Sequence, residues 1–325
     1  RITGAGTLTM ALDADTPNSD LIVMGNSGVA VTKVKFTTTK EPFTIEKLQI
    51  KNGGNSDADY TSVVIEYKNE AGATVTNTGY FSGGVINFSG LTIYVPKDDS
   101  AVVTLKANLN TKDGGATNDH IVALYADYDT NFRAVAKNSS TVVTSAGSGD
   151  AAGKDMYLYE SKPSVGFATD TPSGNLVPSA NTLLAKIAVT ADAAKDITFE
   201  KDNSNILTVQ LSLTRSDDGN DNDDSITLKD ENGTTLDSFT GVDFENTKEF
   251  AFDFSNATFT VPAGQTKYLY VYGTTTDFED QGDSIQVWLD DEDGDIDWGI
   301  NGVGSYNRGN IIFKGDKFGG TFVKP

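Results

Sequence analysis

The residues of this chain best suited to chemistry form an acidic run, Asp290–Asp297. Six of its eight side chains are carboxylates, which repel one another strongly unless a cation lies between them. Calcium takes about six to eight oxygen ligands, and Gly294 allows the loop to curl around an ion. The spacing lacks the glycine and glutamate positions of an EF-hand loop. We expect a calcium site here, with a solvated acidic loop as the alternative interpretation. The expected ligands alternate along the run: Asp291, Asp293, Asp295 and Asp297.

A second acidic segment, 217–224, lies between two expected strands. Its expected calcium ligands are Asp217, Asp218, Asp221 and Asp223. The corresponding segment in the first half of the chain is 52–59, and a weaker cluster of Asp127, Asp129 and Asn131 occupies the place of the acidic run. Aspartate, asparagine and glycine also form long hairpin loops without any metal. For these segments a calcium site and a loop of turn-forming residues both stay open.

Tryptophans flank the acidic run, and sugar faces stack on aromatic rings next to calcium in carbohydrate-binding modules. We expect Trp288 to lie in the core, because it alternates within a strand. Trp298 is the better candidate for a glycan-binding platform. His120 is expected to be a hydrogen-bonded or exposed surface residue rather than a catalytic one.

The composition excludes several classes of site. The chain has no cysteine, which excludes disulfide scaffolds, thiolate metal sites and cysteine nucleophiles. Its single histidine excludes histidine-rich zinc sites. A net charge of -21 argues against nucleic acid and anionic membranes as partners. No segment reaches the ~18–20 apolar residues of a membrane span. Because the sequence carries no catalytic signature, we expect that the protein is not an enzyme.

The elements that position these residues belong to an internal repeat. Five segments recur in the same order, and they divide the chain into two modules, 1–162 and 163–325, related by duplication. The recurring pairs are Asp15–Pro17 with Asp170–Pro172, Lys68–Val75 with Lys229–Leu236, Asn87–Leu109 with Asp253–Thr275, Asp119–Leu124 with Asp283–Trp288, and Lys162–Pro163 with Lys324–Pro325. The second module ends where a further one would begin, so we expect either a longer array or a genuine C-terminus. The absence of an initiator Met indicates a removed signal peptide or an excerpt.

Each module has the pattern of a β-sandwich. Segments such as Phe43–Ile50, Ser62–Tyr67 and Lys267–Tyr272 alternate or run apolar over strand lengths. Asn69–Gly72 and Asp230–Gly233 are expected hairpin turns with glycine at a positive φ. No window keeps a helical period. We therefore expect an all-β chain of two tandem immunoglobulin-like or jelly-roll sandwiches.

Three recurring motifs carry a resemblance to a known family: the strand followed by Asp15–Pro17, the Val261–Thr266 turn before a late strand, and the Lys–Pro exit of each module. In these the chain resembles tandem β-sandwich modules of bacterial surface proteins. It is similar to modules in large exported proteins of candidate-phylum bacteria, and to surface-layer and adhesin stalks. The resemblance implies an extracellular structural or adhesive role and brings no catalytic residues with it.

From these observations we expect an extracellular cell-surface protein, a subunit or segment of a surface layer, stalk or filament that calcium stabilises. Its expected partners are identical subunits or further modules, joined through sheet edges, and Gly6–Leu12 is the candidate for strand exchange. The alternative function is an adhesin or carbohydrate-binding module that recognises surface glycans near Trp298 and the acidic run.

Overall fold

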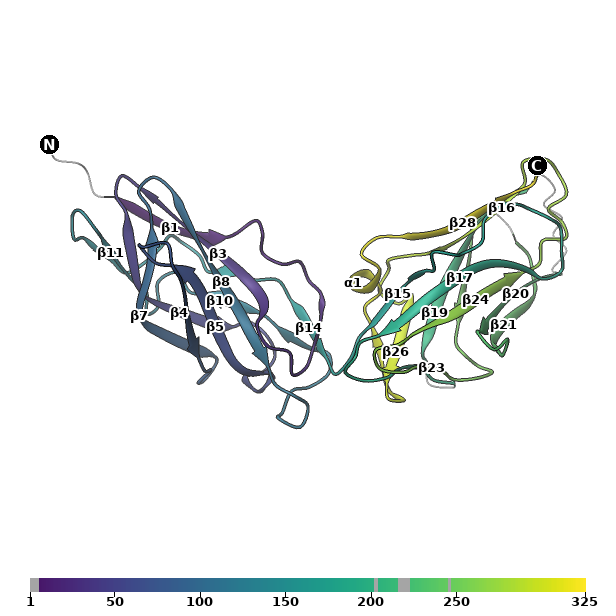
Figure 1. Cartoon of the computed structure of the whole chain (residues 1–325), viewed down its shortest axis with the longest axis horizontal. Coiled ribbons are helices and arrows are strands. Elements are labelled where there is room, and N and C mark those ends of the chain that lie inside the picture. The colour runs from purple at the N-terminus through teal and green to yellow at the C-terminus, as the bar shows by residue number, and fades with distance from the viewer. Residues whose placement is uncertain (1–5, 202–203, 216–222, 245–246) are drawn as a thin grey trace. The chain divides into compact units, whose positions relative to one another are not determined.

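The chain divides into two compact units, Arg1–Glu160 and Ser161–Pro325 (Figure 1). A computed structural model describes residues 6–201, 204–215, 223–244 and 247–325. The division lies close to the boundary after residue 162 that the repeat predicts. Each unit is built almost entirely from strands, so the prediction of an all-β fold is confirmed.

Unit 1 contains two sheets that pack face to face, and a smaller one. All neighbours in the first sheet are antiparallel. Its strands, in spatial order, are β1 (Thr7–Leu12), β3 (Val29–Thr39), β8 (Ser100–Leu109), β5 (Tyr60–Lys68) and β6 (Thr74–Gly79). The second sheet runs β12 (Val142–Val143), β11 (Arg133–Ala136), β4 (Phe43–Asn52), β10 (Leu124–Ala126) and β13 (Ala151–Ala152), with β7 (Val85–Val95) on β4. The smaller sheet runs β2 (Leu21–Val23), β14 (Met156–Tyr159) and β9 (His120–Val122), and η1 (Asp57–Asp59) precedes β5.

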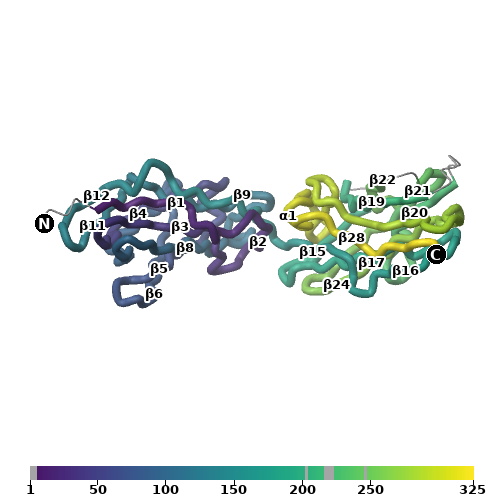
Figure 2. The backbone as a smooth tube through the Cα atoms, turned by 90° about the horizontal axis from the view of Figure 1, so that it is seen from above, coloured from purple at the N-terminus to yellow at the C-terminus, as the bar shows by residue number. Residues whose placement is uncertain are grey.

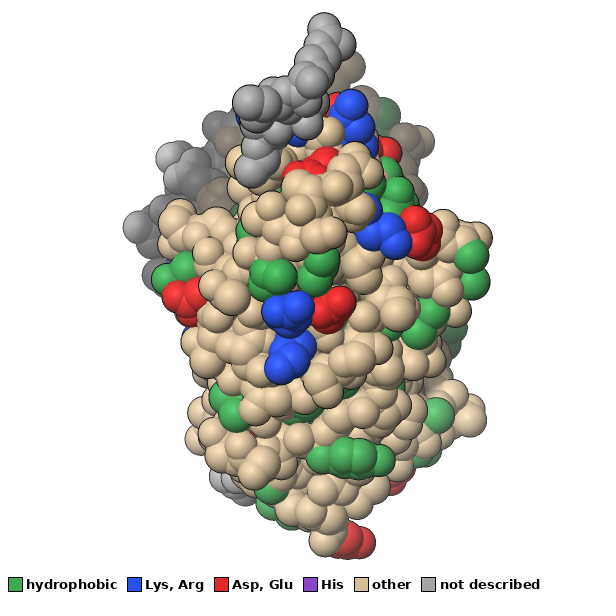
Figure 3. Space-filling model, turned by 90° about the vertical axis from the view of Figure 1, so that its left-hand side faces the viewer, with side chains coloured by type: hydrophobic (Ala, Val, Ile, Leu, Met, Phe, Trp, Pro, Cys, Tyr) green, Lys and Arg blue, Asp and Glu red, His purple; other side chains and the backbone are tan. Residues whose placement is uncertain are grey.

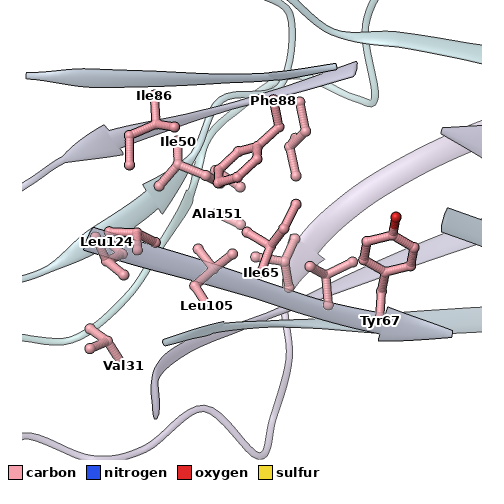
Figure 4. Packing of buried hydrophobic residues seen from close by; sticks show 14 of the residues in the cluster. Val31, Ile50, Ile65, Tyr67, Ile86, Phe88, Leu105, Leu124 and Ala151 are labelled. Atoms are coloured by element: carbon pink, nitrogen blue, oxygen red, sulfur yellow. The ribbon is translucent and has the colours of Figure 1, made fainter. Parts of the chain in front are cut away.

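The core of unit 1 lies between its two sheets, where every second side chain of a strand points inward. Along β8 the buried residues alternate with partly exposed ones from Val103 to Leu109. Figure 4 shows Ile65 and Leu105 from the first sheet facing Ile50 and Ile86 from the second. Each fully buried aliphatic side chain of this kind stabilises the fold by about 1.5–3 kcal/mol. The period of two therefore fixes both the strand conformation and the face that is buried.

Unit 2 also has two sheets. The first runs β15 (Pro163–Phe167), β17 (Thr182–Ala191), β24 (Thr266–Gly273), β20 (Asp224–Asp230) and β21 (Thr235–Val242), again antiparallel. The second runs β16 (Gly174–Asn175), β28 (Lys317–Val323), β25 (Ser284–Leu289), β19 (Ile206–Thr214), β26 (Ile296–Ile300), β18 (Ile197–Phe199) and β23 (Phe259–Val261). Beside this path, β22 (Thr247–Phe252) pairs with β19, and β27 (Val303–Asn307) pairs with β26. Figure 2 shows β16 lying beside β28, with which it pairs in parallel.

The first sheets of the two units have matching strand orders, and the turns between their last two strands match as well. Gly72 has a φ of 77° and Gly233 a φ of 80°, in the left-handed region that glycine adopts without strain. In each turn the glycine N–H donates to a carbonyl three residues earlier, that of Asn69 or Asp230. Both hairpin turns were expected from the sequence. The duplication that they support stays a prediction.

Helical structure in the described residues is short. The α-helix α1 (Gly309–Phe313) packs against β15. Among the described residues, no helix is long and apolar enough to cross a membrane. On the face that Figure 3 presents, acidic and basic side chains lie next to one another at several places, and the hydrophobic side chains form small separate patches.

The hydroxyl of Tyr60, at the start of β5, is hydrogen-bonded to the backbone of Ala123, which lies between β9 and β10, and its removal gives a first prediction. It accepts the N–H of Ala123 at 3.1 Å and lies 3.2 Å from the carbonyl oxygen of the same residue. Tyr60→Phe leaves both buried backbone groups without this partner, so we expect a loss of about 1–3 kcal/mol in the free energy of unfolding, measured by urea denaturation. Tyr80→Phe is the control, because Tyr80 is 71% exposed and should lose nothing measurable. Equal stabilities of the two variants would contradict this account.

Candidate metal centre

Two neighbouring strands of unit 2 bring three carboxylates together at their ends. β25 and β28 pair antiparallel, with Trp288 opposite Phe318 and Leu289 opposite Lys317. Asp290 follows directly after β25, and Asp316 directly precedes β28. One carboxylate oxygen from each of Asp290, Asp291 and Asp316 lies within 4.8 Å of the other two. These three residues are called the acidic cluster below.

A β-bulge in β28 places Asp316 on the same face of the sheet as Asp290. Phe322 is 8% exposed and points into the core, whereas Phe318, four residues earlier, is 60% exposed. Residues four apart in an unbroken strand share a face, but the register between β25 and β28 shifts between Gln286 and Trp288. The shift therefore turns Phe318 outward, and Asp316, two residues earlier, lies on the same side. Only glycine fits the bulge at Gly320, where a Cβ would lie 2.0 Å from the carbonyl oxygen of Pro172.

The carboxylate of Asp290 is held in place by neighbouring groups. Gln210 on β19 donates its side-chain N–H to Oδ2 of Asp290 at 2.8 Å, and Gln210 itself is buried. The backbone N–H of Asp291 donates to Oδ1 of Asp290 at 2.8 Å. Asp290 is thus oriented before any ion binds, which lowers the entropic cost of binding.

Asp295 is a fourth carboxylate beside the cluster, and it is buried without a full set of partners. Its residue is 8% exposed, and among the described residues no group hydrogen-bonds to its Oδ2. Burial, followed by the nearby charges of Asp290, Glu249 and Glu292, raises the pKa of Asp295 to about 6. A buried carboxylate that faces other carboxylates is the environment that a divalent cation stabilises.

The loop that carries Asp295 turns back on itself. Gly294 has a φ of 144°, and the N–H of Asp295 donates to the carbonyl of Glu292. The first residue of α1 packs against this turn, since a Cβ on Gly309 would lie 1.9 Å from the carbonyl oxygen of Glu292. The turn breaks the alternation that the sequence suggested for the four aspartates.

The structure separates the four expected ligands of the acidic run. Asp291 belongs to the acidic cluster and Asp295 lies buried beside it, whereas Asp293 is exposed. Asp297 lies on β26, where hydrogen bonds from Ser305 and Asn205 oppose the burial that raises its pKa. The carboxylates that the structure brings within reach of one ion are therefore those of Asp290, Asp291 and Asp316, and Asp295 lies near enough to feel the charge of Asp290.

At the second acidic segment, the positive charge comes from an arginine side chain of the protein. Asp217, Asp218 and Asp221 lie outside the described residues, and Asp223 is exposed. Asp223 forms a cluster with Asp224 and Asp277. The guanidinium of the buried Arg215 lies 3.6 Å from Asp224 and 3.8 Å from Asp277. Arg215 supplies positive charge there, so the case for a metal is weaker than at the acidic cluster.

The corresponding carboxylates of unit 1 have protein partners. The ammonium group of Lys51 contacts the buried carboxylate of Asp127 and lies 3.0 Å from Asp150. Burial opposes the shift, but the hydrogen bonds from Lys51 and from two backbone N–H groups lower the pKa of Asp127 to about 2. In segment 52–59, the carboxylate of the fully buried Asp59 lies 2.9 Å from Nδ1 of His120. His120 is 30% exposed and has the structural role that was expected of it.

The two tryptophans exchange the places that the sequence assigned to them. Trp298 is 0% exposed, so the prediction that it forms a glycan platform is wrong. Trp288 points to the outer face of β25 and is only partly buried, so its expected place in the core is wrong as well. Its ring is nearly parallel to that of Phe318, with centroids 5.7 Å apart and planes at 15°. Trp288 and Phe318 are called the aromatic pair below.

Sequence reasoning missed Asp290, Asp316 and Phe318. Asp290 belongs to the acidic run but falls outside its alternating set. Asp316 and Phe318 lie far along the chain and reach the site only through the pairing of β25 with β28. The Gly319–Gly320 pair next to Phe318 is the one signal in the sequence, because adjacent glycines in a strand often mark a bulge.

No family model matches the chain, and no curated protein matches it. The C-terminal domain of the Streptococcus pyogenes antigen I/II-family protein AspA is 8% identical, with 96% of this chain and 98% of that chain covered and a TM-score of 0.26. A BSP domain of a biofilm-associated protein is 9% identical, with 97% and 58% covered and a TM-score of 0.25. The serine-rich repeat protein Srr2 from Streptococcus agalactiae is 9% identical, with 96% and 92% covered and a TM-score of 0.23. At these scores no role follows from the likeness.

The lowered pKa of Asp127 predicts an acid-dependent loss of stability in unit 1. Because its folded-state pKa of about 2 lies below the usual 3.8, Asp127 stabilises the fold above about pH 4, and this contribution disappears as the pH falls towards 2. Asp127→Asn should cost about 1–3 kcal/mol at pH 7 and little at pH 2, measured by thermal unfolding across this range. Asp129→Asn changes an exposed neighbour and should cost little at either pH. A cost for Asp127→Asn that does not vary with pH would refute the assignment.

Proposed function

We propose that this chain is an extracellular structural protein whose second unit is stabilised by calcium. The observation that carries the proposal is the acidic cluster together with the buried Asp295, which feels the charge of Asp290 and whose Oδ2 has no hydrogen-bond partner among the described residues. Calcium prefers oxygen ligands and tolerates irregular geometry, so carboxylates from a loop and two strand ends suit it better than they suit magnesium. A calcium site built from carboxylates needs no histidine or cysteine ligand, which agrees with a chain that has one histidine and no cysteine.

In this proposal the ion acts as a crosslink. Asp290 and Asp291 follow β25, and Asp316 precedes β28, so one cation would tie the acidic loop to the start of the last strand. The mutual repulsion of the carboxylates would become attraction to the shared ion. The role of calcium is mechanical, because it stiffens one end of a sheet and takes part in no reaction.

A stiff tandem β-sandwich suits a surface layer, stalk or filament at the cell surface. Neighbouring subunits or modules would contact one another through sheet edges, which offer unpaired backbone donors and acceptors. β1 pairs with β3 inside its own unit and lies at the edge of its sheet, so strand exchange would require it to leave β3. Recognition of glycans is the second candidate function, favoured by the exposed ring of Phe318 beside the acidic cluster.

Calcium should raise the melting temperature of the purified protein. A ligand present at a hundred times its Kd adds about 2.7 kcal/mol, which corresponds to roughly 5–10 °C for a unit of this size. Calorimetry in EGTA and in millimolar calcium measures the shift. Asp316→Asn should abolish most of it, and Asp113→Asn, an exposed change of the same charge in unit 1, should leave it intact.

Asp295→Asn separates repulsion from metal binding. It removes a buried charge that faces other carboxylates, so in EGTA this variant should melt above the wild type while gaining less from calcium. Equal calcium shifts in the wild type, Asp316→Asn and Asp295→Asn would show that the ion binds elsewhere. If Asp293→Asn alone removed the shift, the ligands would be those expected from the alternating sequence.

Assembly is tested by light scattering and negative-stain electron microscopy under the same two conditions. We expect sheets or filaments in millimolar calcium and smaller species in EGTA, because the ion stiffens the unit whose edges must meet. Monomers in both conditions, with the melting temperature still raised by calcium, would remove self-assembly from the proposed function and keep the metal site.

A further inference from the structure

On the outer face of unit 2, β25 and β28 carry an aromatic pair of side chains and, next along the same two strands, an acidic pair. The aromatic pair faces across β25 and β28, and Asp290 and Asp316 follow on the same face two residues further along. Two residues of a strand span about 6.6 Å, so rings and carboxylates lie within reach of one small molecule. An apolar surface thus adjoins a cluster of oxygen ligands.

This combination is unusual for a surface that has only to be soluble. Phe318 is 60% exposed, although burying such a ring inside the sandwich would stabilise the fold. The register shift between Gln286 and Trp288 is the reason that it points outward rather than into the core. Bulges are common next to functional sites because they re-aim a side chain. The bulge here re-aims Phe318 and Asp316 together, so an aromatic ring and a carboxylate are presented on the same face.

We propose that this surface binds a neutral glycan, with one sugar ring against the aromatic pair and its hydroxyl groups on the acidic cluster and the calcium ion held there. A sugar ring has an apolar face of C–H groups and a rim of hydroxyls, and the two rungs offer a matching surface for each. The inference rests on the proposed calcium site for its hydroxyl contacts, and on the aromatic pair for its stacking.

The charge of the site selects the class of glycan. The three carboxylates of Asp290, Asp291 and Asp316 together bring more negative charge than one divalent cation neutralises, and the chain as a whole carries -21. Sulfated or uronic acid chains would be repelled by this field. Uncharged hexoses and N-acetylhexosamines would not be, and their hydroxyls can replace water on calcium.

The experiment uses a panel of hexasaccharides: β-1,4-linked glucose, mannose and N-acetylglucosamine, and α-1,4-linked glucose. Trp288 is the partly exposed member of the chain's two tryptophans, and Trp298 is fully buried, so tryptophan fluorescence reports on this face. In millimolar calcium, at least one glycan should shift the emission with a saturable curve. Phe318→Ala should weaken this binding about five- to ten-fold, and calorimetric titration should give the same ratio. Phe318 is mostly exposed, so its variant should keep the wild-type fold.

Controls separate this proposal from the calcium site itself. Tyr80→Ala removes an aromatic ring of unit 1 that is 71% exposed and should bind glycan as the wild type does. A panel without any binding would overturn the glycan proposal, while a melting temperature raised by calcium would leave the proposed function standing. Binding as tight in EGTA as in calcium would overturn the contact with the ion. A concentration-dependent dimer in sedimentation, lost in Phe318→Ala, would show that a second copy occupies the surface instead.

Discussion

The fold depends on one electrostatic constraint, which is that each buried carboxylate needs positive charge or hydrogen bonds next to it. An isolated charge inside a protein is strongly unfavourable, and this chain buries several aspartates among its strands. Asp127 is paired with Lys51, and Asp224 lies near Arg215. Asp295 is the contrasting case, because the groups that shift its pKa most, after burial itself, are other carboxylates. An acidic chain with few arginines has limited means of its own to meet this demand.

Much of the fold could be predicted from the sequence, because its determinants are local. Alternation along segments such as Lys267–Tyr272 is set by the pleat of a strand, and β24 covers this segment. Turns are equally local, since Gly72 and Gly233 are needed wherever the chain reverses with a positive φ. The matching strand orders of the two first sheets were not visible in this way, because they follow from pairings between distant segments.

The candidate site could be predicted only in part, and the reason is the same. Asp291 and Asp295 belong to one short acidic run, so composition was enough to single them out. Asp316 joins them through the pairing of two strands, and a bulge decides which face it occupies. The tryptophans were misplaced because a period of two shows that residues alternate, but not which of the two faces is buried. Trp288 has the spacing of a core residue and the orientation of a surface one.

Neutralisation of a buried carboxylate by a lysine, as in unit 1, and by the calcium ion proposed for unit 2 would have different consequences. Lys51 is covalently part of unit 1, so the neutralisation of Asp127 is as constant as the fold and fails only when acid protonates the carboxylate. A calcium ion at the acidic cluster would be exchangeable, so by mass action the stability of unit 2 would follow the calcium concentration around the protein. Calcium is scarce inside cells and abundant outside them. In the proposed function, a unit that depends on calcium would become rigid only outside the cell, which is where a structural protein of the cell surface would have to bear load.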